Sequence, residues 1–187
     1  MGILNTGINE VIATTHLNAA PVGIINRGKK LSVMLFSGSQ TCENVIKDRW
    51  LVANFTFDPV IYVKTAFGDL TEDSFVEMDI GGQQMHRLKD AEAWAAFNTE
   101  ITGRSEKGIT ARLIPVKDEI ISPRIHPVNR GFGNLIDATV HATRYMINHD
   151  PKLEKLIHYH LNIVKKCGGE RELEALKLLE EIIKKMD

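Results

Sequence analysis

The sequence predicts an α+β protein in which a β-rich region comes first and a helical region follows. The first two thirds of the chain contain short segments rich in β-branched and aromatic residues, separated by turn-forming residues. From Arg130 onward, apolar residues recur at intervals of three and four, which is typical of amphipathic helices. We therefore expect two domains, residues 1–129 and residues 130–187, with the helical region packed on the first domain.

Three strands are predicted at the start of the chain. Ile8–Thr15 and Asn18–Ile25 are rich in β-branched residues, so we expect a hairpin with His16-Leu17 as its turn. This turn lacks the Asn-Gly or Asp-Gly sequence of a tight type I′ turn, which leaves its geometry open. Leu31–Phe36 is the third strand, because its apolar residues alternate along one face.

A short helix and a strongly alternating strand follow. Thr41–Asp48 is predicted to be helical after a loop of glycine and serine. Leu51–Phe57 alternates between an apolar face and a face that carries Asn54 and Thr56. A buried polar pair of this kind needs a partner, whereas an antiparallel sheet can also turn such a face to water.

The middle of the chain contains further strands, one helix and a loop. Val60–Ala66 and Phe75–Ile80 are predicted strands, and Asp90 is expected to cap a helix. The apolar face of that helix would consist of Ala91, Trp94 and Phe97. Ile109–Val116 is a predicted strand, and Lys117–Asn129 is predicted to be a long loop because it has two prolines and no clear period.

The helical region divides into three helices. The first begins at Arg130, the second follows Asp150-Pro151, and Gly168-Gly169 is expected to end the second, because glycine is the usual helix stop. The third is predicted to run from Glu170 to about Lys185, with leucines on its inner face.

Composition excludes several functional classes. The chain of 187 residues has a formal net charge of −1, and its basic residues are interleaved with acidic ones, which argues against a nucleic-acid partner. Its two cysteines, Cys42 and Cys167, have no zinc spacing, so we expect no metal site and a reduced, cytoplasmic location. We also expect no signal peptide and no membrane association, because the N-terminal residues lack a basic, apolar leader and no apolar run is long enough to span a bilayer.

The loop before the first helix has the composition of a phosphate-binding site. The start of a helix offers unpaired N–H groups and the positive end of a dipole, and Gly38 lets the backbone approach a ligand closely. Ser39 and Thr41 add hydroxyl groups, and Asn44 lies one turn further on. The alternative is that Ser39 or Thr41 serves only as an N-cap.

Small and polar residues surround the turn of the first hairpin. They are Thr14, Thr15, Asn18, Ala19 and Ala20. Small side chains let a flat ring lie close to a strand, and free strand N–H groups can reach its acceptors. The hairpin and the neighbouring loop together therefore favour a ligand with a planar ring and a phosphate.

These segments resemble the FMN-binding split β-barrel superfamily, and within it an archaeal family of uncharacterised, flavin reductase-like proteins. The resemblance is carried by Thr14-Thr15, Asn18–Gly23, Gly38–Asn44 and Val52–Thr56, and it extends through Trp94, Gly108–Ala111 and Arg130–Gly133. It implies a split β-barrel of Greek-key type in residues 1–129, with the helices as a C-terminal appendage. It also implies a homodimer with one FMN at each end of the interface.

The resemblance also implies roles for individual residues. Thr14, Thr15, Asn18 and Ala19 would meet the isoalloxazine ring and ribityl chain. Ser39, Gln40, Thr41 and Asn44 would bind the phosphate, with Asn54 and Thr56 nearby. Such sites often include an arginine near the phosphate, and Arg27, Arg49, Arg124 and Arg130 are candidates.

Three functional hypotheses follow. The first is an FMN-dependent oxidoreductase of the flavin-reductase type, which would use a small-molecule electron donor or acceptor. The second is a non-catalytic flavin carrier or sensor. The third is a structural or interaction module whose barrel holds no cofactor. The sequence identifies no catalytic residue. Asp137, His141 and Arg144 follow helical spacing on a polar face, which a solvated surface explains, and His160 is expected to be a packed core residue.

Overall fold

The structure, a computed structural model, describes residues 2–28 and 30–185. Within these residues the chain divides into two compact units. The first contains the chain up to Thr56 together with Asp69–Arg124, and the second contains Phe57–Gly68 together with the chain from Ile125 onward. The second unit thus includes a segment that the sequence analysis places in the first domain. The predicted packing of the helices on the barrel stays a prediction.

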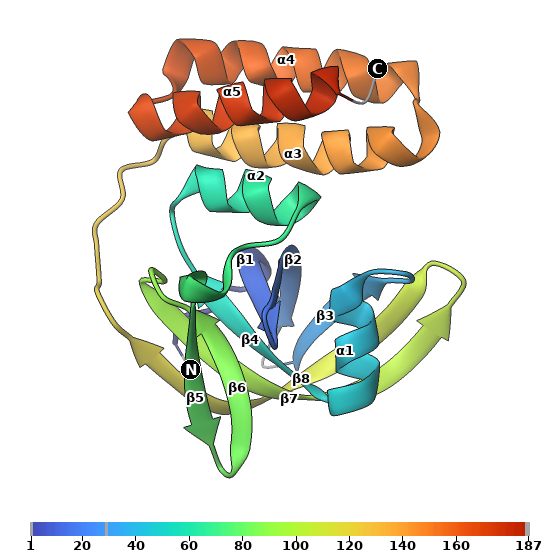
Figure 1. The fold of residues 1–187 in the computed structure, drawn as a ribbon, viewed down its shortest axis with the longest axis vertical. Helices are drawn as coiled ribbons and strands as arrows, with labels where there is room; N and C mark the ends of the chain where they lie inside the picture. The colour runs from blue at the N-terminus through green and yellow to red at the C-terminus, as the bar shows by residue number, and fades with distance from the viewer. Residues whose placement is uncertain (1, 29, 186–187) are drawn as a thin grey trace. The chain divides into compact units, whose positions relative to one another are not determined.

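The first unit is a closed antiparallel β-barrel (Figure 1). Its strands are β1 (Gly7–Thr15), β2 (Asn18–Arg27), β3 (Lys30–Phe36), β4 (Trp50–Phe55), β7 (Ala93–Ser105) and β8 (Gly108–Ile120). Their order around the barrel is β1-β2-β3-β8-β7-β4, so the long β7–β8 hairpin closes the gap between β3 and β4. Helix α1 (Gln40–Asp48) connects β3 to β4. This arrangement confirms the predicted α+β class and the barrel.

Strand β4 shows how the alternating pattern builds two cores. Leu51 and Ala53 lie in the cluster that fills the barrel, whereas Trp50 and Val52 lie in a second cluster on the outer face. The hairpin of β5 (Phe75–Ile80) and β6 (Gln83–Leu88), which follows a short 3-10 helix at Glu72–Ser74, contributes Ile80 and Met85 to that outer cluster. The outer face of β4 is therefore covered rather than solvated.

Three predicted elements were wrong. Val60–Ala66 is helical and belongs to α2 (Pro59–Phe67), because Asp58 caps its first turn and proline suits a helix start. The segment after Asp90 is strand β7, in which Trp94 and Phe97 face opposite clusters. The many alanines of this segment are compatible with a helical and with a strand pattern. Pairing with β4 and β8 on either side stabilises the strand. The predicted loop at Lys117 starts later, because β8 continues to Ile120.

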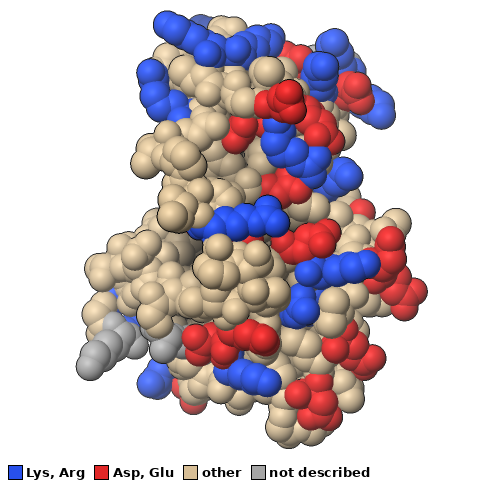
Figure 2. Space-filling view, turned by 90° about the vertical axis from the view of Figure 1, so that its left-hand side faces the viewer, with Lys and Arg blue, Asp and Glu red and all other residues tan. Residues whose placement is uncertain are grey.

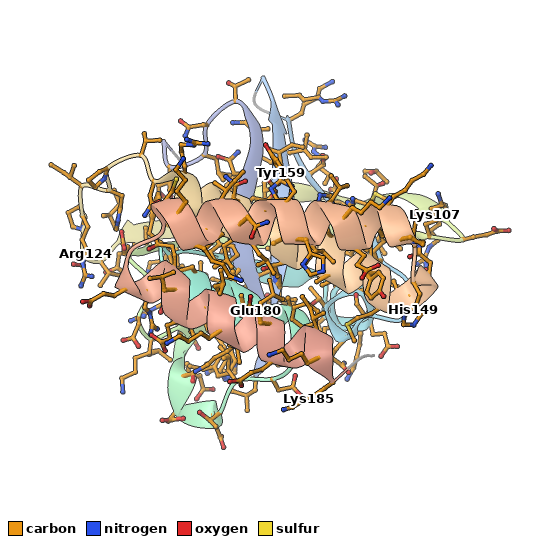
Figure 3. The ribbon with its side chains drawn as sticks, turned by 90° about the horizontal axis from the view of Figure 1, so that it is seen from above. Lys107, Arg124, His149, Tyr159, Glu180 and Lys185 are labelled. Atoms are coloured by element: carbon orange, nitrogen blue, oxygen red, sulfur yellow. The ribbon has the colours of Figure 1, made fainter. Side chains whose placement is uncertain are left out.

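The second unit is a helical bundle of α2, α3 (Arg130–Asn148), α4 (Pro151–Cys167) and α5 (Glu170–Lys184). All four helices contribute to one core, whose members include Val63, Leu135, Leu161 and Leu176. In Figure 3, α4 and α5 run side by side, and Glu180 lies between them. The Glu180 carboxylate forms an ion pair with the Lys165 ammonium group, at 2.8 Å. The three predicted C-terminal helices are confirmed, and α2 adds a fourth.

The surface agrees with the charge pattern of the sequence. Figure 2 shows acidic and basic side chains interleaved on one face, without a continuous basic stripe on that face. No helix in the described part of the chain is both long and apolar enough to cross a bilayer. The two cysteines are free thiols, and that of Cys42 is buried.

Candidate functional site

The start of helix α1 is built by a glycine and a serine. Gly38 has a φ of +81°, a conformation that glycine adopts without strain, and it turns the chain into the helix. The Ser39 hydroxyl accepts a hydrogen bond from the Cys42 N–H (3.2 Å) and donates to the Phe36 carbonyl (2.8 Å). Ser39 is therefore the N-cap, as the alternative interpretation of the loop expects. The N–H groups of Gln40 and Thr41 lie in the first turn, where a helix offers no acceptor of its own.

A hydrogen-bond network joins the start of α1 to the turn between β1 and β2. The Asn18 amide donates to the hydroxyls of Thr41 (2.8 Å) and Thr15 (3.2 Å). The Asn44 amide donates to the hydroxyl of Thr15 (3.0 Å) and to its carbonyl (3.2 Å). Gln40 completes the network by donating to the Asn44 side-chain oxygen (2.8 Å). Five of the residues proposed from the sequence thus lie together.

The direction of these bonds gives the site its chemistry. A hydroxyl has one hydrogen to donate and can also accept. The hydroxyls of Thr15 and Thr41 accept from amides here, so these bonds do not use the hydroxyls' own hydrogens. Both threonines are nearly fully buried, and a hydrogen bond in such surroundings is stronger than one in water.

Contacts of His16 with Asp48 and Trp50 stabilise the hairpin turn. His16 has a φ of +57°, and its ring nitrogen lies 2.9 Å from the carboxylate of Asp48, at the far end of α1. The ring also makes an edge contact with Trp50 (5.1 Å between centroids). The helix and the hairpin are therefore connected at both ends of α1, and the turn itself contains His16 in a left-handed conformation. Ala19 is buried beside this turn and pairs with Thr14.

Thr14 and Asn54 belong to a different network. Both are completely buried. The Asn54 amide donates to the Ile12 carbonyl (2.9 Å) and to the Thr14 hydroxyl (3.1 Å), while its oxygen accepts from the Leu88 N–H (2.7 Å). The Thr14 hydroxyl donates to the His86 carbonyl. These bonds tie the β5–β6 hairpin to the outer face of the barrel. Their predicted contact with a cofactor stays a prediction, as does that of Thr56, which follows β4 and is partly buried.

Arg104, which is not among the arginines proposed from the sequence, lies near the first turn of α1. Burial raises the pKa of the Cys42 thiol, the positive charge of Arg104 lowers it, Glu43 raises it, and a hydrogen bond with Ile109 lowers it. Arg104 therefore lies within electrostatic range of the first turn of α1. Of the arginines proposed from the sequence, Arg49 caps the opposite end of this helix.

A second group of titratable side chains lies in the helical unit. The rings of His141 and His160 are 5.4 Å apart, and a nitrogen of His160 lies 2.8 Å from the side-chain oxygen of Asn134. Burial lowers the pKa of His141, and the charges of His160 and Arg144 lower it further, against an opposing effect of Asp137. Among the described residues, no group of three or more metal-ligating side chains is placed to hold an ion.

Known proteins match nearly the whole chain. A crystal structure of the FMN-bound protein MM1853 from Methanosarcina mazei superimposes with a TM-score of 0.90 at 37% identity, covering 95% of each chain. An uncharacterised protein of Methanocaldococcus jannaschii is 29% identical over 189 residues, which span 92% of this chain and 96% of its own. An FMN-binding protein from Thermus thermophilus, at 11% identity, shares the fold with a TM-score of 0.52 over 64% of this chain and 74% of its own.

Two family matches cover both regions of the chain. Residues 9–122 match the N-terminal domain of the protein family of unknown function DUF447, and residues 129–181 match a second DUF447 region. The FMN-bound Methanosarcina protein carries the same family designation. The chain therefore belongs to the DUF447 family, in agreement with the predicted resemblance to an archaeal family of uncharacterised proteins.

Proposed function

We propose that this protein binds FMN, with the phosphate at the start of α1 and the ring beside the β1–β2 turn. The observation that carries the proposal is the network in which Asn18 connects Thr15 to Thr41. It joins the two places where a ring and a phosphate would lie, and its bonds do not use the hydroxyls' own hydrogens. The FMN-bound family member supports the same ligand.

The residues at the start of α1 suit a phosphate dianion. The N–H groups of Gln40 and Thr41 and the Thr41 hydroxyl are donors, and the helix dipole adds positive potential. Gly38 carries no side chain, and the space where its Cβ would lie is open. A phosphate oxygen could therefore approach the backbone there. The small side chain of Ala19 lies beside the turn where the ring would bind. A bound flavin would supply hydride or electron transfer, while these residues would hold and orient it.

Thr41→Val is expected to weaken FMN binding by about tenfold or more and to weaken riboflavin binding less. The substitution removes a hydroxyl that would donate to the phosphate, which only FMN carries, and charged hydrogen bonds contribute about 1.5–3 kcal/mol. Titration with each flavin, followed by fluorescence quenching, measures both affinities. Thr99→Val is the matched control, because its buried hydroxyl has no partner among the described residues. Equal weakening of both flavins by Thr41→Val would refute the assignment.

We also propose that the protein is an oxidoreductase of the flavin-reductase type, which uses a small-molecule electron donor or acceptor. We propose in addition that it forms a homodimer. Beyond its pairing with β3, which ends at Leu113, strand β8 carries the exposed apolar residues Val116 and Ile120, and these support a partner surface. Two free cysteines support a cytoplasmic location. Steady-state oxidation of NADH or NADPH tests the activity. Bound, reducible flavin without turnover would instead identify a carrier or sensor.

A further inference from the structure

The β7–β8 hairpin places an arginine on the face of the sheet that packs against α1. Arg104 lies directly opposite Ile109 in the ladder. Cross-strand partners project from the same face of a sheet. Ile109 belongs to the barrel cluster that includes Cys42, in the first turn of α1. The side chain of Arg104 therefore leaves the sheet on the α1 side.

A β-bulge is responsible for this orientation. Ile101 pairs with Ala111, but Gly103 pairs with Thr110, so Thr102 is an extra residue in β7. Such a bulge reverses the alternation of side chains and re-aims those that follow it. Arg112, on the paired strand β8, lies between the buried residues Ala111 and Leu113. It therefore points outward, where it forms an ion pair with Glu100 (3.4 Å).

Arg104 is exposed, and within residues 2–28 and 30–185 no carboxylate lies within ion-pair distance of its side chain. The hairpin that carries it is fixed to the loop before α1, since the Ser37 N–H donates to the Lys107 carbonyl (3.0 Å). Figure 3 marks Lys107 at the tip of this hairpin. The positive charge of Arg104 also lowers the pKa of the Cys42 thiol in the first turn of α1, which agrees with a side chain on this side of the hairpin.

We propose that Arg104 pairs with the phosphate at the start of α1 and sets the preference of this site for FMN over riboflavin. This inference rests on the proposed function. The amides and hydroxyls of the loop are neutral donors, whereas a phosphate at neutral pH carries a charge of about −1.5 to −2. A guanidinium supplies a matching charge and two parallel N–H groups, the geometry that suits phosphate oxygens.

The test compares the wild-type protein with Arg104→Gln and Arg112→Gln in titrations with FMN and with riboflavin, after dialysis has removed any bound chromophore. Arg104→Gln is expected to weaken FMN binding by about tenfold, equivalent to about 1.4 kcal/mol, with riboflavin unaffected. The loss should shrink at high salt, because screening weakens an exposed charge pair. Arg104→Lys, which keeps the charge, should lose less.

Arg112→Gln is the matched control, because it removes an arginine from the same strand pair on the opposite face. It should leave both affinities unchanged, since exposed ion pairs contribute little. A wild type that prefers FMN while Arg104→Gln keeps that preference would overturn the role of Arg104 alone. Equal weakening of both flavins would also overturn it. A wild type that binds neither flavin would contradict the proposed function itself, and this inference with it.

Discussion

Replacement of Gly108 by alanine is expected to destabilise the barrel by about 3 kcal/mol or more, or to prevent its folding. Gly108 has a φ of +150°, and an added Cβ would lie 2.0 Å from the Leu35 carbonyl oxygen and 3.0 Å from the Cα of Phe36. Both contacts are to backbone, so no side chain can rotate away. Strands β3 and β8 would have to separate where the chain leads into α1.

Urea unfolding of Gly108→Ala and Gly103→Ala tests this expectation. Gly103 lies on the paired strand β7, and its added Cβ would meet nothing closer than the Thr110 side chain at 3.8 Å. Gly103→Ala should therefore change the free energy of unfolding by less than about 1 kcal/mol. A Gly108→Ala protein with the unfolding midpoint of the wild type would show that β3 and β8 do not approach this closely.

Asn54→Ala is expected to lower the free energy of unfolding by about 2–4 kcal/mol. Asn54 is fully buried and is bonded to Ile12, Thr14 and Leu88. Its removal leaves the buried Leu88 N–H without an acceptor, which costs more than the net value of one hydrogen bond. The β5–β6 hairpin should become the first part of the barrel unit to exchange its amide hydrogens.

Asn98→Ala is the control for this substitution, because Asn98 is an exposed amide on the neighbouring strand β7. It should change stability by less than about 0.5 kcal/mol. If Asn54→Ala unfolds at the same urea concentration as Asn98→Ala, the network is not a structural connection. The predicted contact of Asn54 with the flavin would be supported if the variant, while still folded, lost affinity for FMN and riboflavin alike.

Local sequence patterns predict the elements whose environment is local. The alternation predicted for Leu51–Phe57 is confirmed as far as Phe55, where β4 ends, because each face of β4 packs against one apolar cluster. The start of α1 was also predictable, because Gly38, Ser39 and Thr41 are the residues that a helix start favours. The two-residue turn places Asn18 next to Thr15, whereas the bond from Asn18 to Thr41 joins residues that are 23 positions apart.

Features that depend on distant partners were not predictable. Val60 and Val63 favour a strand by propensity, but their packing against the other helices makes α2 stable. The acceptor of the Leu88 N–H lies 34 residues earlier in the chain, at Asn54. Arg104 reaches the α1 face only because Thr102 is bulged, and strict alternation from Ile101 would place it outside.

The binding of a phosphate dianion by the start of α1 is tested most directly by the phosphorus NMR signal of bound FMN as a function of pH. The second pKa of a free phosphate monoester is about 6. Hydrogen bonds and positive potential favour the more highly charged form and lower that pKa. The account predicts that bound FMN keeps the chemical shift of the dianion at pH values where free FMN has taken up a proton. A bound phosphate that titrates like the free one would contradict it.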